Sequence, residues 1–144
     1  MEPIQAIWVI GAQGKVLFSD EFYSHALLDI NSALFGSMIM GIHILASEFG
    51  EEDVQKITLG DMVIYLSRDD DSNIVFALKC DKKANKLTIN KVLYEVERLF
   101  SEIFEGTIDS EEMDIGLFYT FKKELDKLIG LDDRTRVESL IEFL

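Results

Sequence analysis

The chain has 144 residues, 48% of them hydrophobic, and its 27 acidic and 14 basic side chains give a formal net charge of −13. This length predicts a single domain over residues 1–144, because domains cluster at roughly 100–150 residues. The one cysteine, Cys80, excludes an internal disulfide and a thiolate metal cluster. The acidic charge argues against binding to nucleic acid or to anionic membranes, since both recruit clustered Lys and Arg.

The N-terminus and the most apolar stretch of the chain bear on its location. The chain begins Met1-Glu2-Pro3, without the basic start or the small-residue cleavage site of a signal peptide. Residues 30–47 carry no charge, but they include polar side chains and fall short of the ~20 apolar residues that span a bilayer. We therefore expect a cytoplasmic protein with no direct membrane insertion.

The N-terminal third of the chain predicts a β-hairpin followed by a long helix. Residues 4–10 (IQAIWVI) are apolar at both alternating sets of positions, which is typical of a strand covered on both faces. Residues 11–14 (GAQG) favour a tight turn, and residues 15–19 return as the partner strand. Ser24 is expected to cap a helix that runs to about Phe49.

The predicted helix over residues 24–49 is apolar around most of its circumference. One broad face holds Leu27, Ile30, Leu34, Met38, Leu45 and Phe49, and much of the rest is filled by Leu28, Phe35, Ile39, Met40, Ile42 and Ile44. Such a helix must be buried on more than one side, and only one side can face a sheet. We therefore expect a partner to bind an outward face made of Phe35, Gly36, Met38, Ile39, Gly41 and Ile42.

Small residues at a four-residue spacing, Ser32 with Gly36 and Ser37 with Gly41, would let another backbone approach this helix closely. The alternative is that these small residues pack closely within the chain's own fold.

The rest of the chain predicts three strands and then helices. Residues 56–59 alternate as an edge strand does, 62–66 run back beside them, and the nearly all-apolar 74–78 are expected beside the first strand. Thr88 is expected to cap an amphipathic helix that ends near Gly106. Further helices are expected from Asp109 or Ser110 to about Ile129 and over residues 132–144.

No motif in the sequence predicts catalysis, a metal site or a cofactor. His25 and His43 have no second ligand at the spacing of a zinc helix. Residues 69–73 begin like a calcium loop but lack its glycine and its final carboxylate. Residues 11–15 lack the spacing of a phosphate-binding loop. We therefore expect a protein that is not an enzyme and binds no cofactor.

One group of basic side chains departs from the acidic background, near the end of the last strand and the start of the next helix. It consists of Lys79, Lys82, Lys83, Lys86 and Lys91. Such a patch could attract an acidic partner. The alternative is a solvated loop that only reduces local repulsion between charges.

The order of these elements resembles a longin domain over about residues 4–129. The resemblance rests on the hairpin of residues 4–10 and 15–18, the helix that begins near Ser24 and the strands over residues 56–78. The apolar first strand, the Gly turn and Val16-Leu17-Phe18-Ser19 are similar to the start of longin and small adaptin-type chains. Related roadblock domains usually begin with a helix, which this pattern lacks.

The longin resemblance implies an α+β fold of profilin-like architecture, in the order β-β-α-β-β-β-α-α. A five-stranded antiparallel sheet would have its two N-terminal strands at or next to the centre. The long helix would cover one face, and two or three C-terminal helices the other. The helix over residues 132–144 would be an addition to the minimal pattern.

The same resemblance implies a non-catalytic interaction module, because longin and roadblock domains are associated with small GTPase regulation, vesicle trafficking complexes and dimerisation. We expect a homodimer, or an adaptor for a small GTPase or a trafficking-type complex. A freestanding module of this kind suggests a prokaryotic, archaeal source. The alternative is a small-ligand sensor with a pocket between the long helix and the sheet, lined by Trp8, Met38, Met40 and Tyr65.

Overall fold

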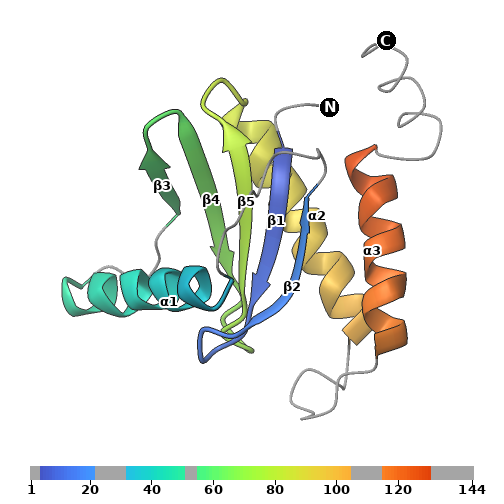
Figure 1. Cartoon of the computed structure of the whole chain (residues 1–144), viewed down its shortest axis with the longest axis horizontal. Coiled ribbons are helices and arrows are strands. Elements are labelled where there is room, and N and C mark those ends of the chain that lie inside the picture. The colour runs from blue at the N-terminus through green and yellow to red at the C-terminus, as the bar shows by residue number, and fades with distance from the viewer. Residues whose placement is uncertain (1–3, 22–31, 51–54, 105–114, 131–144) are drawn as a thin grey trace.

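A computed structural model describes residues 4–21, 32–50, 55–104 and 115–130, which form an α+β fold in the predicted order of elements. The strands are β1 (Ile4–Ile10), β2 (Val16–Glu21), β3 (Lys56–Leu59), β4 (Met62–Arg68) and β5 (Val75–Asp81). The helices are α1 (Ser32–Glu48), α2 (Lys86–Phe104) and α3 (Ile115–Ile129). Figure 1 shows α1 on one side of the sheet and α2 and α3 on the other, which confirms the predicted fold class.

The five strands form one antiparallel sheet in the order β2-β1-β5-β4-β3. β5 pairs with β1, with Trp8 opposite Ala77, so the predicted position of the last strand beside the first is confirmed. The expectation that both N-terminal strands lie at or next to the centre is wrong for β2, which is an edge strand. Ser19 and Asp20 explain this position, because an edge strand tolerates polar side chains that an interior strand would bury.

Alternation along the strands divides the interior into two cores, one on each face of the sheet. Under α1, the ring of Phe35 stacks on the indole of Trp8 with centroids 4.2 Å apart, and Ile39 is fully buried beside them. The opposite core is larger and lies under α2 and α3, where Phe76 of β5 meets Phe100 edge-on at 5.5 Å. Aromatic pairs in these geometries contribute beyond the area that they bury.

The first half of α1 packs closely on the turn between β1 and β2. Gly36 is buried, and a Cβ atom placed on it would overlap the carbonyl oxygen of Gly14. Gly14 has a positive φ of 85°, a conformation that favours glycine. The close backbone approach at Gly36 is therefore made by the turn of the same chain. This agrees with the alternative that the small residues pack within the chain's own fold.

The structure corrects the predicted start of α2. The side-chain oxygen Oδ1 of Asn85 accepts hydrogen bonds from the backbone N–H groups of Leu87 and Thr88, at 2.9 and 3.3 Å. Asn85 is thus the N-cap, and the expectation that Thr88 caps the helix is wrong, because Thr88 already lies inside the first turn. Residues 24–31, the start of the third predicted helix and the predicted helix over residues 132–144 lie outside the described residues.

Among the described residues, no helix combines the length and the apolar character that crossing a bilayer requires.

Candidate functional site

The outward side of α1 carries a continuous row of exposed apolar residues, here called the α1 stripe. The stripe consists of Leu34 (70% exposed), Met38 (40%), Gly41, Leu45 (53%) and Phe49 (77%). Phe49 continues the helical path, because its backbone N–H donates to the carbonyl of Leu45 at 3.3 Å. A Cβ atom on Gly41 would meet nothing within 4 Å, so the middle of the stripe is open to a close approach.

The structure places the predicted partner-binding residues on two different sides of α1. The expectation that Phe35, Gly36 and Ile39 face outward is wrong, because all three are buried toward the sheet and the hairpin turn. Met38 and Gly41 are exposed, and Ile42 is half-buried. Helical periodicity separates these sets, since residues four apart share a face.

The α1 stripe contains three further residues that the predicted partner site omitted, Leu34, Leu45 and Phe49. The sequence placed them on one broad face with Met38, but both sides of the helix are apolar, so the pattern did not indicate which side meets the sheet.

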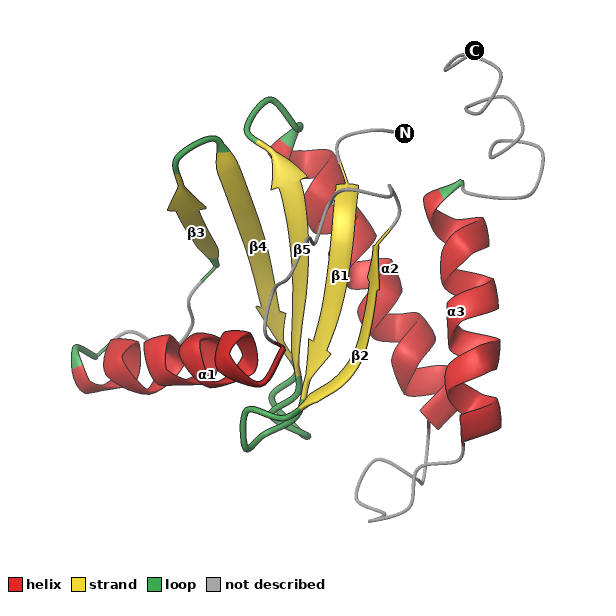
Figure 2. Cartoon of the chain, viewed as in Figure 1, coloured by secondary structure: helices red, strands yellow, loops and turns green. Residues whose placement is uncertain are grey.

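Strand β3 forms the outer edge of the sheet beside β4. Ile57 packs against the core under α1, and Leu59, two residues further on the same side, is half exposed. Figure 2 shows α1 crossing this side of the sheet, with its C-terminal end reaching past the β3 edge. An edge strand presents backbone donors and acceptors to any approaching chain. The α1 stripe and β3 are therefore the two described surfaces best suited to a protein partner.

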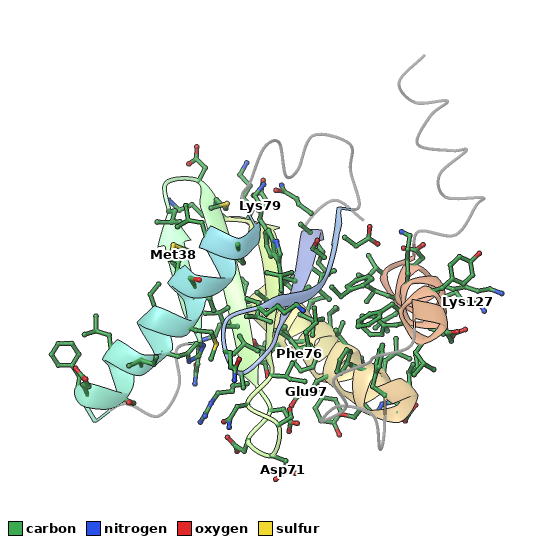
Figure 3. All side chains as sticks on the ribbon, turned by 60° about the horizontal axis from the view of Figure 1, so that its bottom comes forward. Met38, Asp71, Phe76, Lys79, Glu97 and Lys127 are labelled. Carbon is green, nitrogen blue, oxygen red and sulfur yellow. The ribbon has the colours of Figure 1, made fainter. Side chains whose placement is uncertain are left out.

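The predicted lysine patch is only partly a free surface. Lys79 is half-buried, and its Nζ donates to Oε1 of Gln5 at 2.9 Å. The four exposed members are Lys82, Lys83, Lys86 and Lys91. Figure 3 shows Lys79 and Asp71 at opposite ends of the sheet. That the patch binds an acidic partner stays a prediction.

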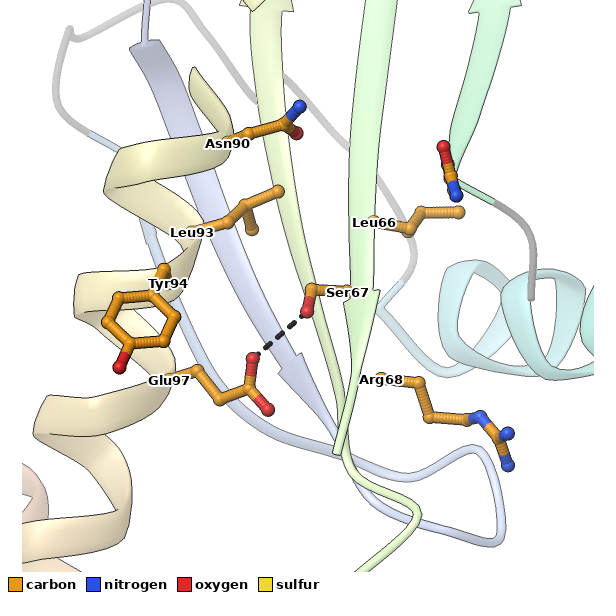
Figure 4. A pocket seen from close by; sticks show the side chains of 8 residues that line it. Leu66, Ser67, Arg68, Asn90, Leu93, Tyr94 and Glu97 are labelled. Carbon is orange, nitrogen blue, oxygen red and sulfur yellow. Dashed lines mark hydrogen bonds between the residues drawn. The ribbon is translucent and has the colours of Figure 1, made fainter. Parts of the chain in front are cut away.

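A cleft of about 330 Å³ lies between α2 and the end of β4 and is here called the Glu97 cleft. Its lining residues are Gln55, Leu66, Ser67, Arg68, Asn90, Leu93, Tyr94 and Glu97. The hydroxyl of Ser67 donates to Oε2 of Glu97 at 3.0 Å (Figure 4). Burial raises the pKa of the Glu97 carboxyl, the hydrogen bond from Ser67 lowers that pKa, and the charges of Asp69 and Asp70 raise it further.

The raised pKa of Glu97 predicts a stability that depends on pH. A carboxyl with a higher pKa in the folded than in the unfolded chain binds more protons when folded, so the free energy of unfolding falls as pH rises through the folded pKa. We expect Glu97→Gln to match the wild type below the ordinary pKa of 4.5 and to be the more stable protein at pH 7. Urea unfolding below pH 4.5 and at pH 7 measures the difference in free energy of unfolding between Glu97→Gln and the wild type. A Glu97→Gln protein less stable than the wild type at pH 7 would show that the carboxylate is stabilising.

The sequence matches no family model and no curated protein. Among solved structures, MglB of Myxococcus xanthus matches with a TM-score of 0.52 at 16% identity, over 69% of this chain and 85% of MglB. The chain has a longin-like fold.

Two further solved structures match this longin-like fold at lower TM-scores. The gliding protein MglB of Thermus thermophilus has a TM-score of 0.47 at 20% identity, over 66% of this chain and 71% of its own. A Roadblock/LC7 domain of Streptomyces avermitilis has a TM-score of 0.48 at 13% identity, over 67% of this chain and 84% of that domain's chain.

The alternative of a ligand pocket between the long helix and the sheet is not supported by the positions of its residues. Trp8 and Tyr65 lie in the cores on opposite faces of the sheet, and Met38 is exposed, so these residues do not line one cavity. Met40 does line an open cavity of about 660 Å³ with His43 and Ser47, next to the turn between β4 and β5. The pocket expected from Trp8, Met38, Met40 and Tyr65 together is therefore wrong.

The described residues hold no group of three or more His, Cys, Asp or Glu side chains that could bind a metal ion. Cys80 is buried in the larger core, and burial raises the pKa of its thiol to about 12. The thiol therefore stays protonated at neutral pH, which makes it a poor nucleophile and a poor metal ligand.

Proposed function

We propose that this protein is a non-catalytic interaction module that pairs with a second copy of itself through the α1 stripe and docks a protein partner, such as a small GTPase, as an adaptor. The observation that carries this proposal is the α1 stripe, because its four large apolar side chains and Gly41 face solvent along one side of the helix. Burying an exposed Leu, Met or Phe side chain contributes about 1.5–3 kcal/mol at most. Pairing removes this apolar surface from water.

Charge favours a second copy as the occupant of the stripe. Two copies of a chain with a net charge of −13 repel each other, so a stable contact must lie where acidic side chains are absent. Helix α1 meets this condition, because its only charged residue is Glu48 at the C-terminal end. A two-fold axis near Gly41 would place each stripe against its own copy, and the missing side chain would let the two helices approach closely.

The proposed dimer is tested by the charge substitution Met38→Glu. Sedimentation equilibrium of the wild type is expected to give a dimer at micromolar concentration, and Met38→Glu a monomer with an unchanged circular dichroism spectrum, because the glutamate would be buried beside its own copy. The matched control is Leu87→Glu, which changes a strongly exposed leucine on α2 and should stay dimeric. A wild type that is monomeric at millimolar concentration, or a dimeric Met38→Glu, contradicts the proposal.

The adaptor half of the proposal is supported by the longin-like fold and tested separately. Size-exclusion chromatography of the wild type with each small GTPase of the same genome, loaded with GDP or a non-hydrolysable GTP analogue, is expected to yield one stable complex. A failure of every pair to co-elute contradicts the adaptor role and leaves the dimer unaffected. The cytoplasm is the proposed place of action, because a chain whose one cysteine is Cys80 can form no internal disulfide.

A further inference from the structure

The Glu97 cleft lies on the face of the sheet opposite α1, with one wall from α2 and the other from the end of β4. Along α2 the residues Asn90, Leu93, Tyr94 and Glu97 share one side, since they are three to four positions apart. Figure 4 shows Glu97 on the helix facing Ser67 on the strand, with the ring of Tyr94 on the same helix. Leu93 adds apolar surface on the α2 side of this cleft, whereas the side chain of Leu66 packs in the core under α1. A volume of about 330 Å³ suits one long side chain.

The electrostatics of this cleft favour a cation. Glu97 forms no ion pair with any residue in the described ranges, and its one hydrogen bond comes from the neutral hydroxyl of Ser67. Asp69 and Asp70 add negative potential at the carboxylate. A cation that entered the cleft would pair with Glu97 and reduce this repulsion.

Arg68 does not supply that cation, although it contributes to the lining. Its Nη1 donates to Oδ1 of Asn73 at 3.0 Å, and its Nη2 lies 3.4 Å from Oδ1 of Asp70. Figure 4 shows its guanidinium group pointing away from Glu97. The site therefore keeps an ionisable carboxylate open to an incoming group.

The remaining lining groups match a guanidinium better than an ammonium ion. The ring of Tyr94 is exposed one helical turn before Glu97, where a flat cation can stack on it. The side-chain amide of Asn90 offers a carbonyl oxygen to a further N–H donor. Leu93 offers apolar contact to the three-carbon stem of an arginine.

We propose that the Glu97 cleft binds an arginine side chain of a partner protein, with Glu97 as the ion-pair acceptor and Tyr94 as the stacking surface. This inference rests on the proposed function as an interaction module, but it uses the face opposite the α1 stripe. Failure of the α1 interface and failure of the cleft can therefore be told apart by experiment.

The probe for this site is Nα-acetyl-arginine amide, titrated into ¹⁵N-labelled full-length protein at pH 7. We expect saturable amide shifts confined to the residues around Ser67, Tyr94 and Glu97, with a Kd of about 1 mM, as befits a fragment of this size. Glu97→Gln is expected to weaken binding at least about tenfold, because it removes the charge and keeps the hydrogen-bond acceptor. The matched control is Glu48→Gln, which removes one charge at the far end of α1 and should leave the Kd unchanged.

Several results would overturn the inference. Shifts spread over the acidic surface, or a Kd that Glu97→Gln leaves unchanged, would show diffuse counterion binding. Equal binding of Nα-acetyl-lysine amide or spermidine would contradict the assignment to arginine. The same titration on the Met38→Glu protein separates the two proposals, since a monomer that still binds the probe keeps the cleft whatever the fate of the dimer.

Discussion

Gly36→Ala is expected to lower the free energy of unfolding by about 3 kcal/mol, one of the two largest effects predicted for this chain. The added Cβ atom would overlap the carbonyl oxygen of Gly14 and lie 3.2 Å from Cγ2 of Val16. The turn cannot give way easily, because Gly14 is held at a positive φ and its N–H donates to the carbonyl of Gly11 at 2.9 Å. Relief of the overlap must therefore come from a shift of α1 away from the sheet, which weakens the packing of Phe35 on Trp8.

Urea unfolding of Gly36→Ala measures this effect, with Gly41→Ala as the matched control on the same helix. A Cβ atom on Gly41 meets nothing within 4 Å, so its alanine variant should be more stable by up to about 1 kcal/mol through helix propensity alone. Both variants are best made in the Met38→Glu protein, so that self-association does not enter the comparison. Equal stabilities of the two alanine variants would contradict the close contact between α1 and the turn.

Phe121→Ala is expected to lower the free energy of unfolding by about 3–5 kcal/mol, because it leaves a cavity in the middle of the larger core. The ring of Phe121 is fully buried and meets three other rings edge-on, with centroids 5.0 Å away for Phe18, 5.4 Å for Phe100 and 6.1 Å for Phe104. These contacts join α3 to both α2 and β2. Loss of the ring should therefore detach α3 as well as leave a cavity.

The control for Phe121→Ala is Tyr119→Ala, which removes an exposed aromatic ring two residues earlier on α3. Its free energy of unfolding should stay within about 0.5 kcal/mol of the wild type. Thermal and urea unfolding of both variants provide the comparison. A Phe121→Ala protein as stable as the control would mean that α3 contributes little to the fold.

The pairing of the two interior strands β1 and β5 followed from the sequence because burial on both faces leaves a direct pattern. Residues 4–10 and 74–78 are nearly continuous apolar runs, and they became the paired strands β1 and β5 in the interior of the sheet. The polar end of β2 indicates an edge strand, but the longin resemblance led to a more central prediction.

The orientation of α1 could not be predicted, because its apolar residues surround the helix. Periodicity places Phe35 with Ile39 and Leu34 with Met38, yet both pairs are apolar and either could meet the sheet. Contacts between residues distant in sequence determine which side of α1 meets the sheet. The ring of Phe35 stacks on Trp8, and Gly36 packs against the turn at Gly14. A helix with one polar face would have indicated from the sequence which side meets the sheet.

The Glu97 cleft was also invisible in the sequence, for a different reason. Ser67 and Glu97 are thirty positions apart and meet only because α2 packs back across β4. Glu97 has no local motif that separates it from the other acidic residues of the chain. Pairings of this kind depend on tertiary packing rather than on spacing along one element.

Because α1 and α2 lie on opposite faces of the sheet, their placement determines how many cleft sites the proposed dimer would present to a partner. In the proposed dimer, pairing through α1 would leave the cleft on the α2 side of each copy uncovered, so one dimer would offer two equivalent sites. A single guanidinium contact of millimolar strength is too weak to hold a partner, but a binding chain with two basic segments of sufficient reach gains from effective concentration. Recognition would then depend on how far apart those segments lie as much as on the residues within them.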